Sequence, residues 1–242
     1  MKKIILLDIG THKCQEFKSM FHTNPLLFFL RVLSHKIMRL KSPSFKNVFS
    51  IIKSQKILKK NRENFFVILT EPNTNVLNHP LYKKADQVYC VAVGDNNEKI
   101  ILSNLYFHSK NPDFQEQGPS IYQEKSGIKS KNLIPITKIS PEYYLNFIKN
   151  NFEKKFLNCE YELVLRMNCE GSEYELIKHA KDIFKDKFNL VLGSLDDVMK
   201  YHGESVYNDM SGFLDKENIQ FIPFNTILTS HESALKKLVA HM

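Results

Sequence analysis

Several polar residues and one glycine follow short apolar runs in this sequence, which is where an α/β protein binds its ligand. They are Asp8 and Gly10, Glu71, Asp95, and Asn168 with Glu170. A glycine after the first strand lets the backbone approach a ligand closely, and a carboxylate after the second strand can accept two hydrogen bonds from a ribose diol. This pattern predicts a site for a cofactor that contains adenosine.

Two classes of adenosine cofactor use such a site, and the turn after the first apolar run separates them. A nicotinamide dinucleotide needs a G-x-G-x-x-G turn to hold its pyrophosphate, whereas residues 10–14 are G-T-H-K-C and contain one glycine. S-adenosylmethionine carries no phosphate, so a D-x-G turn followed by an acidic end of the second strand is sufficient for it. The sequence therefore favours S-adenosylmethionine over a dinucleotide.

The elements that must position these residues alternate between apolar strands and amphipathic helices. Buried strands are predicted at residues 3–9, 65–69, 87–93, 162–167, 190–192 and 219–224, with a strand at 99–102 returning from the turn at 94–97. Helices are predicted at 141–156, at 172–184 and from residue 230 onward. This alternation is typical of an α/β fold with a doubly wound, mostly parallel, Rossmann-like sheet, and we expect residues 1–242 to form a single domain. Residues 106–132 are predicted to be a polar loop.

Composition limits the class of protein further. With 43% hydrophobic and 25% charged residues, the chain has the composition of a globular protein. The four cysteines (Cys14, Cys90, Cys159 and Cys169) form no CxxC pair, so neither a zinc ribbon nor a disulfide framework is predicted. No metal site is expected, with the alternative that Asp, Glu or His residues at the strand ends hold one divalent ion. No apolar run is long enough for a membrane span, and Asp8 makes the first run too short for a signal peptide. We expect a cytoplasmic protein, with peripheral membrane association as an option.

The net charge of +8 belongs to one segment. From Phe17 to Arg62 there are eleven Lys and Arg residues and no Asp or Glu, so the remainder of the chain is mildly acidic. Apolar residues recur there at helical spacing, and Pro43 separates two helical stretches. Residues 21–62 are thus predicted to be a basic helical insertion after the first strand, near the mouth of the cofactor site. Its basic face is either simply solvated or, over residues 25–62, a docking surface for an anionic membrane or a lipid-linked sugar, with nucleic acid the weaker candidate.

Four blocks of the sequence resemble, in order, the FkbM-type methyltransferases. They are L-D-I-G at 7–10, T-E-P-N at 70–73, V-A-V-G-D at 91–95 and L-R-M-N-C-E-G-S-E-Y-E-L-I at 165–177. The family patterns are D-x-G-A-N-x-G, F-E-P-N, A-V-G-D and K-I-D-V-E-G-A-E-x-E-V-L. The resemblance covers about residues 4–20 and 64–195, and its last block is the most specific.

The resemblance implies an S-adenosylmethionine-dependent O-methyltransferase with a sheet of the class I methyltransferase type. Its acceptor would be a small-molecule or glycan hydroxyl, most often that of a sugar. The implied cofactor-binding residues are Asp8, Gly10 and Thr11 for the methionine part, Glu71 with Pro72 for the ribose, and Ala92, Val93 and Asp95 for the adenine. Asn168 and Glu170 would lie beside the reacting methyl group and the acceptor.

The chain departs from the family pattern at positions that bear on catalysis. Thr11-His12 replaces the A-N pair, Cys14 replaces the second glycine, and Asn168 replaces an aspartate. An asparagine cannot act as a general base at neutral pH, so that role would pass to Glu170 or to a histidine, His12 or His202. The alternative is a non-catalytic Rossmann-like adaptor that binds an anionic partner through the basic segment.

Overall fold

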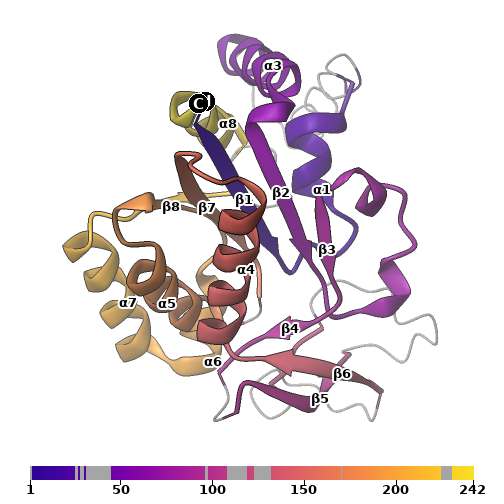
Figure 1. The fold of residues 1–242 in the computed structure, drawn as a ribbon, viewed down its shortest axis with the longest axis vertical. Coiled ribbons are helices and arrows are strands. Elements are labelled where there is room, and N and C mark those ends of the chain that lie inside the picture. Colours follow the sequence, from indigo (N-terminus) through magenta and orange to yellow (C-terminus); the bar gives the residue numbers. More distant parts are fainter. Residues whose placement is uncertain are drawn as a thin grey trace.

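A six-stranded parallel sheet with helices on both faces forms the body of the molecule, and a smaller three-stranded sheet lies at one end of it (Figure 1). This computed structural model describes residues 2–24, 27, 30, 45–95, 98–107, 119–122, 132–169, 171–224 and 231–242.

The large sheet has the strand order β3-β2-β1-β7-β8-β9, and every neighbouring pair in it is parallel. The strands are β1 (Lys3–Ile9), β2 (Phe65–Thr70), β3 (Gln87–Tyr89), β7 (Tyr161–Met167), β8 (Phe188–Gly193) and β9 (Gln220–Pro223). Its central strands are unbroken apolar runs because both faces of the sheet are covered. The strand order reverses between β1 and β7, which is where ligands bind in open α/β sheets.

Helices divide between the two faces according to the alternation of side chains along β1. Ile4 and Leu6 pack against α1 (Gln15–Phe17), the π-helical turn η1 (Lys18–His22), α3 (Phe45–Lys60) and α8 (His231–His241). Ile5 and Leu7 belong to the core on the other face, with α4 (Pro141–Lys155), α5 (Glu173–Phe184) and α7 (Glu204–Lys216). The short helix α6 (Asp196–His202) precedes α7. The doubly wound α/β prediction is confirmed at this level.

The smaller sheet corrects one predicted strand. Residues 87–93 do not form a single strand: β3 ends at Tyr89 in the large sheet, and β4 (Ala92–Val93) belongs to the small one. β4 pairs in parallel with β6 (Leu133–Ile139), which also pairs antiparallel with β5 (Ile100–Tyr106). The expected return strand is β5, but its partner is β6 and not the strand before it. Neither β6 nor the pair α6 and α7 was predicted.

The described part of the basic segment is a covering helix of the sheet. Ile51 and Leu58 of α3 are buried in the core, and α3 packs against α8 at the amino ends of the strands (top of Figure 1). Ligands of open α/β sheets bind at the carboxyl ends of the strands, the end where the small sheet lies (Figure 1). The predicted position of the basic segment beside the cofactor mouth is therefore wrong for α3. The first predicted helix of the segment lies almost entirely outside the described residues. Among the described helices, none has the length and hydropathy to cross a bilayer.

Gly193, the last residue of β8, is a position where the fold requires glycine. Its φ is +137°, and an added Cβ would lie 1.9 Å from the carbonyl oxygen of Met167. We expect Gly193→Ala to lower the free energy of unfolding by about 2–4 kcal/mol. Alanine is strained at this φ value, and its Cβ would push the backbone of β7 away from β8. Equilibrium urea unfolding measures this difference.

Gly212 provides the matched control. It lies on the exposed side of α7, with no described atom within 4 Å of an added Cβ. Gly212→Ala should raise the free energy of unfolding by about 0.5–1 kcal/mol, because alanine loses less backbone entropy in a helix. Equal effects at the two glycines would contradict the close packing of β7 and β8.

Candidate functional site

A cavity of about 290 Å³ lies at the switch point of the sheet, at the carboxyl ends of β1, β2 and β7. Its size is at the lower end of the range for small-molecule sites, about 300–1,000 Å³. Leu105 of the small sheet and Ile121 complete its wall. Eight residues predicted from the sequence line it: Gly10, Thr11, His12, Glu71, Pro72, Ala92, Val93 and Asn168. Segments that are far apart in the sequence thus meet at one site.

The other three predicted residues have different positions. Asp8 is fully buried behind the wall of the cavity, where it forms an ion pair with Arg166. Asp95 is exposed and is not among the lining residues, and its backbone carbonyl accepts a hydrogen bond from Lys138 Nζ at 2.8 Å. Glu170 lies outside the described residues. The structure therefore does not bring Asp95 to the cavity.

Gly10 brings two loops of the site into contact. With φ at +74°, it lies so close to the end of β7 that an added Cβ would be 2.1 Å from the carbonyl oxygen of Asn168. The Asn168 N–H donates to the carbonyl of Ile9 at 3.1 Å. A side chain at this position would collide with the backbone of Asn168, so the protein's own packing requires a glycine here. The sequence suggests a different reason, which is the close approach of a ligand.

The turn after β1 is held by hydrogen bonds within the protein. Gly10 N–H and Thr11 N–H donate to the Thr70 carbonyl at 2.9 and 3.4 Å, and His12 N–H donates to Glu71 Oε2 at 2.7 Å. Cys14 N–H donates to the Thr11 carbonyl at 2.8 Å. These N–H groups are committed to protein acceptors, so they cannot bind a pyrophosphate as a glycine-rich loop does.

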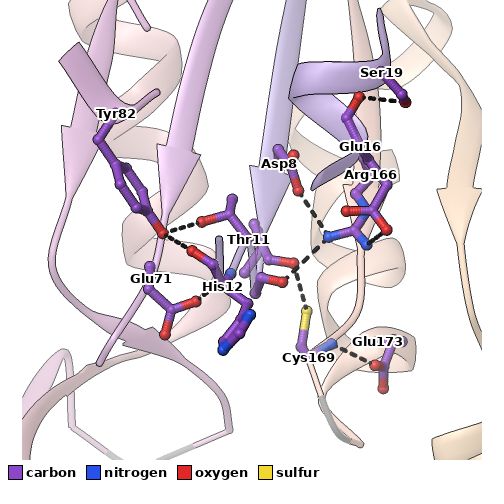
Figure 2. Close-up of polar contacts among 12 residues, drawn as sticks. Asp8, Thr11, His12, Glu16, Ser19, Glu71, Tyr82, Arg166, Cys169 and Glu173 are labelled. Carbon is purple, nitrogen blue, oxygen red and sulfur yellow. Dashed lines mark hydrogen bonds and ion pairs between the residues drawn. The ribbon is translucent and has the colours of Figure 1, made fainter. Parts of the chain in front are cut away.

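Left-handed backbone shapes the same turn. His12 and Cys14 have φ values of 45° and 54°, a conformation that favours glycine. Position 14 is where the FkbM pattern has glycine, and Cys14 adopts this conformation with its side chain fully buried. The Tyr82 hydroxyl donates to the His12 carbonyl at 2.5 Å and lies 2.6 Å from Thr11 Oγ1, which holds the turn against η4 (Tyr82–Lys84). Figure 2 shows the His12 ring projecting between Glu71 and Cys169.

Glu71 is buried at the end of β2 with both carboxylate oxygens in use. Oε2 accepts from His12 N–H, and Oε1 accepts from Asn73 N–H at 2.9 Å. Burial raises the pKa of Glu71 to about 7, although the two backbone hydrogen bonds lower it. A carboxylate offers about four acceptor positions, so Glu71 can still accept hydrogen bonds from a ligand in the cavity.

Arg166 on β7 joins two buried carboxylates (Figure 2). Its Nη1 lies 3.0 Å from Asp8 Oδ1, and its Nη2 lies 3.0 Å from Glu16 Oε1. Nη1 also donates to the Gly10 carbonyl at 3.2 Å. Burial raises the pKa of Asp8 to about 6, although the positive charge of Arg166 lowers it. Burial also opposes the charge of Arg166, but the carboxylates of Glu16 and Asp8 outweigh it and raise its pKa.

The wall of the cavity has an excess of acidic groups. Glu16, Glu71 and Arg166 all line it, and Arg166 is shared between two carboxylates. Asp8 Oδ2 and Arg166 Nε are buried without a hydrogen-bond partner among the described residues. Because the one guanidinium is already neutralised, the wall suits a cationic ligand and offers little to a phosphate.

A buried carboxylate also organises the loop between β7 and α5. Glu173 is fully buried and accepts hydrogen bonds from Cys169 N–H at 2.7 Å and Gly171 N–H at 2.8 Å. Burial raises its pKa to about 7. On another side of the loop, His202 Nε2 lies 2.7 Å from the Gly171 carbonyl. His202 is not among the residues that line the cavity, so it is a weaker candidate for the general base than His12.

Among the residues that were not predicted as site residues, four hold the site together through the hydrogen bonds and ion pairs described above: Glu16, Tyr82, Arg166 and Glu173. Arg166 and Glu173 belong to the block at 165–177, where both are polar in or beside apolar runs, so burial with a partner could have been suspected. Glu16 and Tyr82 follow loops and carry no local signal. Only the fold brings them to the turn after β1.

Comparisons of this chain with protein-family models, with curated proteins and with solved structures find no match. The resemblance to FkbM-type methyltransferases therefore rests on the four blocks of this sequence.

The ion cluster predicts a large effect of removing its cation. Arg166→Met would leave Asp8 and Glu16 buried without a counter-charge, which should cost about 3–5 kcal/mol of unfolding free energy at pH 7. The loss should shrink as the pH falls toward about 6. Without Arg166, which lowers the pKa of Asp8, this pKa rises above its wild-type value of about 6, so the folded variant binds a proton at a pH where the folded wild type does not. Urea unfolding at several pH values measures both effects.

A control variant and a fallback variant accompany this prediction. Lys236→Met removes an exposed ion pair with Glu232 on α8 and should cost less than about 1 kcal/mol. If Arg166→Met does not fold, the double variant Asp8→Asn/Arg166→Met also removes one of the two buried carboxylates. It should recover part of the stability, although Glu16 still lacks its cation. A loss at Arg166 as small as that at Lys236 would contradict the role given to the cluster.

Proposed function

We propose that this protein is an S-adenosylmethionine-dependent O-methyltransferase that acts on a hydroxyl group of a sugar or glycan. The observation that carries the proposal is the acidic cavity at the switch point, whose wall is built from the blocks that resemble FkbM-type methyltransferases.

Charge separates the two cofactor classes. S-adenosylmethionine has a sulfonium and an ammonium group against one carboxylate, so it is a net cation, whereas a dinucleotide has an anionic pyrophosphate. Glu16 and Glu71 line the cavity, and Arg166 is neutralised by its own partners. The N–H groups of the turn are also committed within the protein. Both facts favour the cationic cofactor.

The residues of the cavity suit distinct parts of that cofactor. Glu71 would accept hydrogen bonds from the ribose hydroxyls, and Ala92 and Val93 would form the apolar wall beside the adenine. Gly10, Thr11 and Glu16 would surround the methionine part, with Asp8 behind them. When bound, the cofactor supplies an electrophilic methyl group on its sulfonium. The protein's own task is then to orient the acceptor hydroxyl and to take up its proton.

His12 is the described residue best suited to take up that proton. Asn168 lines the cavity but has a neutral amide, which can orient a hydroxyl and cannot deprotonate it. The imidazole of His12 projects between Glu71 and Cys169, and a neutral imidazole is a good base near pH 7 (Figure 2). We therefore assign His12 as the base and Asn168 as a positioning residue, with Glu170 as the other candidate base.

Ligand-dependent thermal unfolding tests the cofactor assignment. At 100 times its dissociation constant, S-adenosylmethionine or S-adenosylhomocysteine should raise the melting temperature by about 5–10 °C, because such binding adds about 2.7 kcal/mol. Glu71→Gln should lose most of this shift, since a glutamine retains the shape but offers fewer acceptor positions. Glu142→Gln, at an exposed position of α4, controls for the lost charge and should keep the shift.

Transfer of a labelled methyl group to a pool of sugars and glycans then tests the reaction. A shift with both ligands but no transfer to any acceptor would favour a cofactor-binding protein without activity. No shift with either ligand would contradict the proposal and favour the adaptor, whose partner is bound through the basic segment.

A further inference from the structure

The outward face of α3 is a row of exposed lysines around an exposed phenylalanine. Ile51, Ser54, Gln55 and Leu58 form the buried face of the helix. On the opposite side lie four exposed residues at spacings of four, three and four: Phe49, Lys53, Lys56 and Lys60. Phe49 is 64% exposed. We call these four residues the α3 stripe, which extends about 16 Å along the helix.

The charge of the α3 stripe is not balanced nearby. The sequence has no Asp or Glu between Phe17 and Arg62, and within the described part of the chain no ion pair involves Lys53, Lys56 or Lys60. Exposed helices of soluble proteins commonly mix both signs of charge. A face with cations alone and an exposed aromatic side chain is suited to an anionic partner.

The same end of the molecule has a second group of cations. A groove at the amino ends of β1 and β2 is lined by Lys3, Arg62 and Lys84 around His22. Burial, followed by the nearby charges of Lys84, Arg62 and Lys59, lowers the pKa of His22 to about 4. Glu63 and Asp86 also line the groove, and Asp86 pairs with Arg62 at 2.8 Å. The three cations and two carboxylates of the groove give it a smaller positive excess than the α3 stripe.

We propose that the α3 stripe binds the surface of an anionic lipid bilayer. Lysine ammonium groups on flexible stems suit a diffuse layer of headgroups, and Phe49 can insert its ring at the boundary between headgroups and acyl chains. Nucleic acid is the less suitable partner, because the stripe has one aromatic ring and no arginine among its residues. α3 and the small sheet lie at opposite ends of the molecule (Figure 1), so a bound membrane leaves the cavity open to solvent.

Co-sedimentation with vesicles tests this proposal without reference to enzymatic activity. The protein should bind vesicles of 70% phosphatidylcholine and 30% phosphatidylglycerol, bind pure phosphatidylcholine far less, and be released by 0.5 M NaCl. Lys53→Glu/Lys56→Glu should weaken partition onto the anionic vesicles by about 30-fold or more, since each lysine near such a surface contributes about fivefold and the reversed charge adds repulsion. Phe49→Ser should also weaken partition onto the anionic vesicles. The fold-change that it causes should depend less on salt, because the ring contributes apolar contact and no charge.

The matched control changes the same charge elsewhere. Lys154→Glu/Lys216→Glu alters two exposed lysines at the ends of α4 and α7, on the other face of the sheet. This pair should retain most of the binding, and both pairs should keep the wild-type melting temperature. If the glutamate pair on α3 unfolds the protein, Lys53→Gln/Lys56→Gln replaces it.

Three results would overturn the proposal. They are equal binding to anionic and neutral vesicles, equal losses in the stripe and control pairs, and binding of a single-stranded RNA oligonucleotide through the α3 stripe with no binding to vesicles. None of these results bears on the cofactor cavity, because binding of S-adenosylmethionine is measured without lipid.

Discussion

The shared guanidinium of Arg166 is the interaction on which the site depends. It reaches from β7 to Asp8 on β1 and to Glu16 on α1, and it also binds the Gly10 carbonyl. Three segments that meet at the switch point are thus held by one buried cation. Burying three charged groups is costly unless each has a partner, so the turn after β1 has little freedom to change. The surplus carboxylate of the same cluster makes the neighbouring cavity acidic.

The remaining contacts of the site follow from this constraint. With the turn held against β7, Gly10 has no room for a side chain, and the N–H groups of the turn bind the Thr70 carbonyl and Glu71. Tyr82 supports the turn from the other side. A glycine-rich loop leaves its N–H groups open to phosphate, whereas this turn directs acceptors and an imidazole at the cavity. Open α/β sheets bind many kinds of ligand at the switch point, so the charge and hydrogen bonding of the turn are what distinguish the two cofactor classes here.

Much of the fold could be predicted from the sequence, because apolar runs and helical spacing are local signals. The runs at 3–9 and 162–167 were placed correctly because strands buried on both faces are unbroken. The division of 87–93 into two strands was not predicted, since one continuous apolar run has no signal for the sheet to which each half belongs. Gly10, Glu71 and Asn168 could be predicted because each follows the end of an apolar strand. The other predicted lining residues came from the resemblance to the FkbM blocks or, for His12, from the search for a base. Glu16 and Tyr82 could not be predicted, because only tertiary structure brings them there.

The central claim is that the cavity takes a cationic adenosyl cofactor. Isothermal titration of the wild-type protein with S-adenosylmethionine and with NAD⁺, in the same buffer at pH 7.5, tests it most directly. We predict saturable binding of S-adenosylmethionine at one site, no heat from NAD⁺, and no competition when NAD⁺ is present in excess. Binding of NAD⁺ that displaces S-adenosylmethionine, or binding of NAD⁺ alone, would contradict the account.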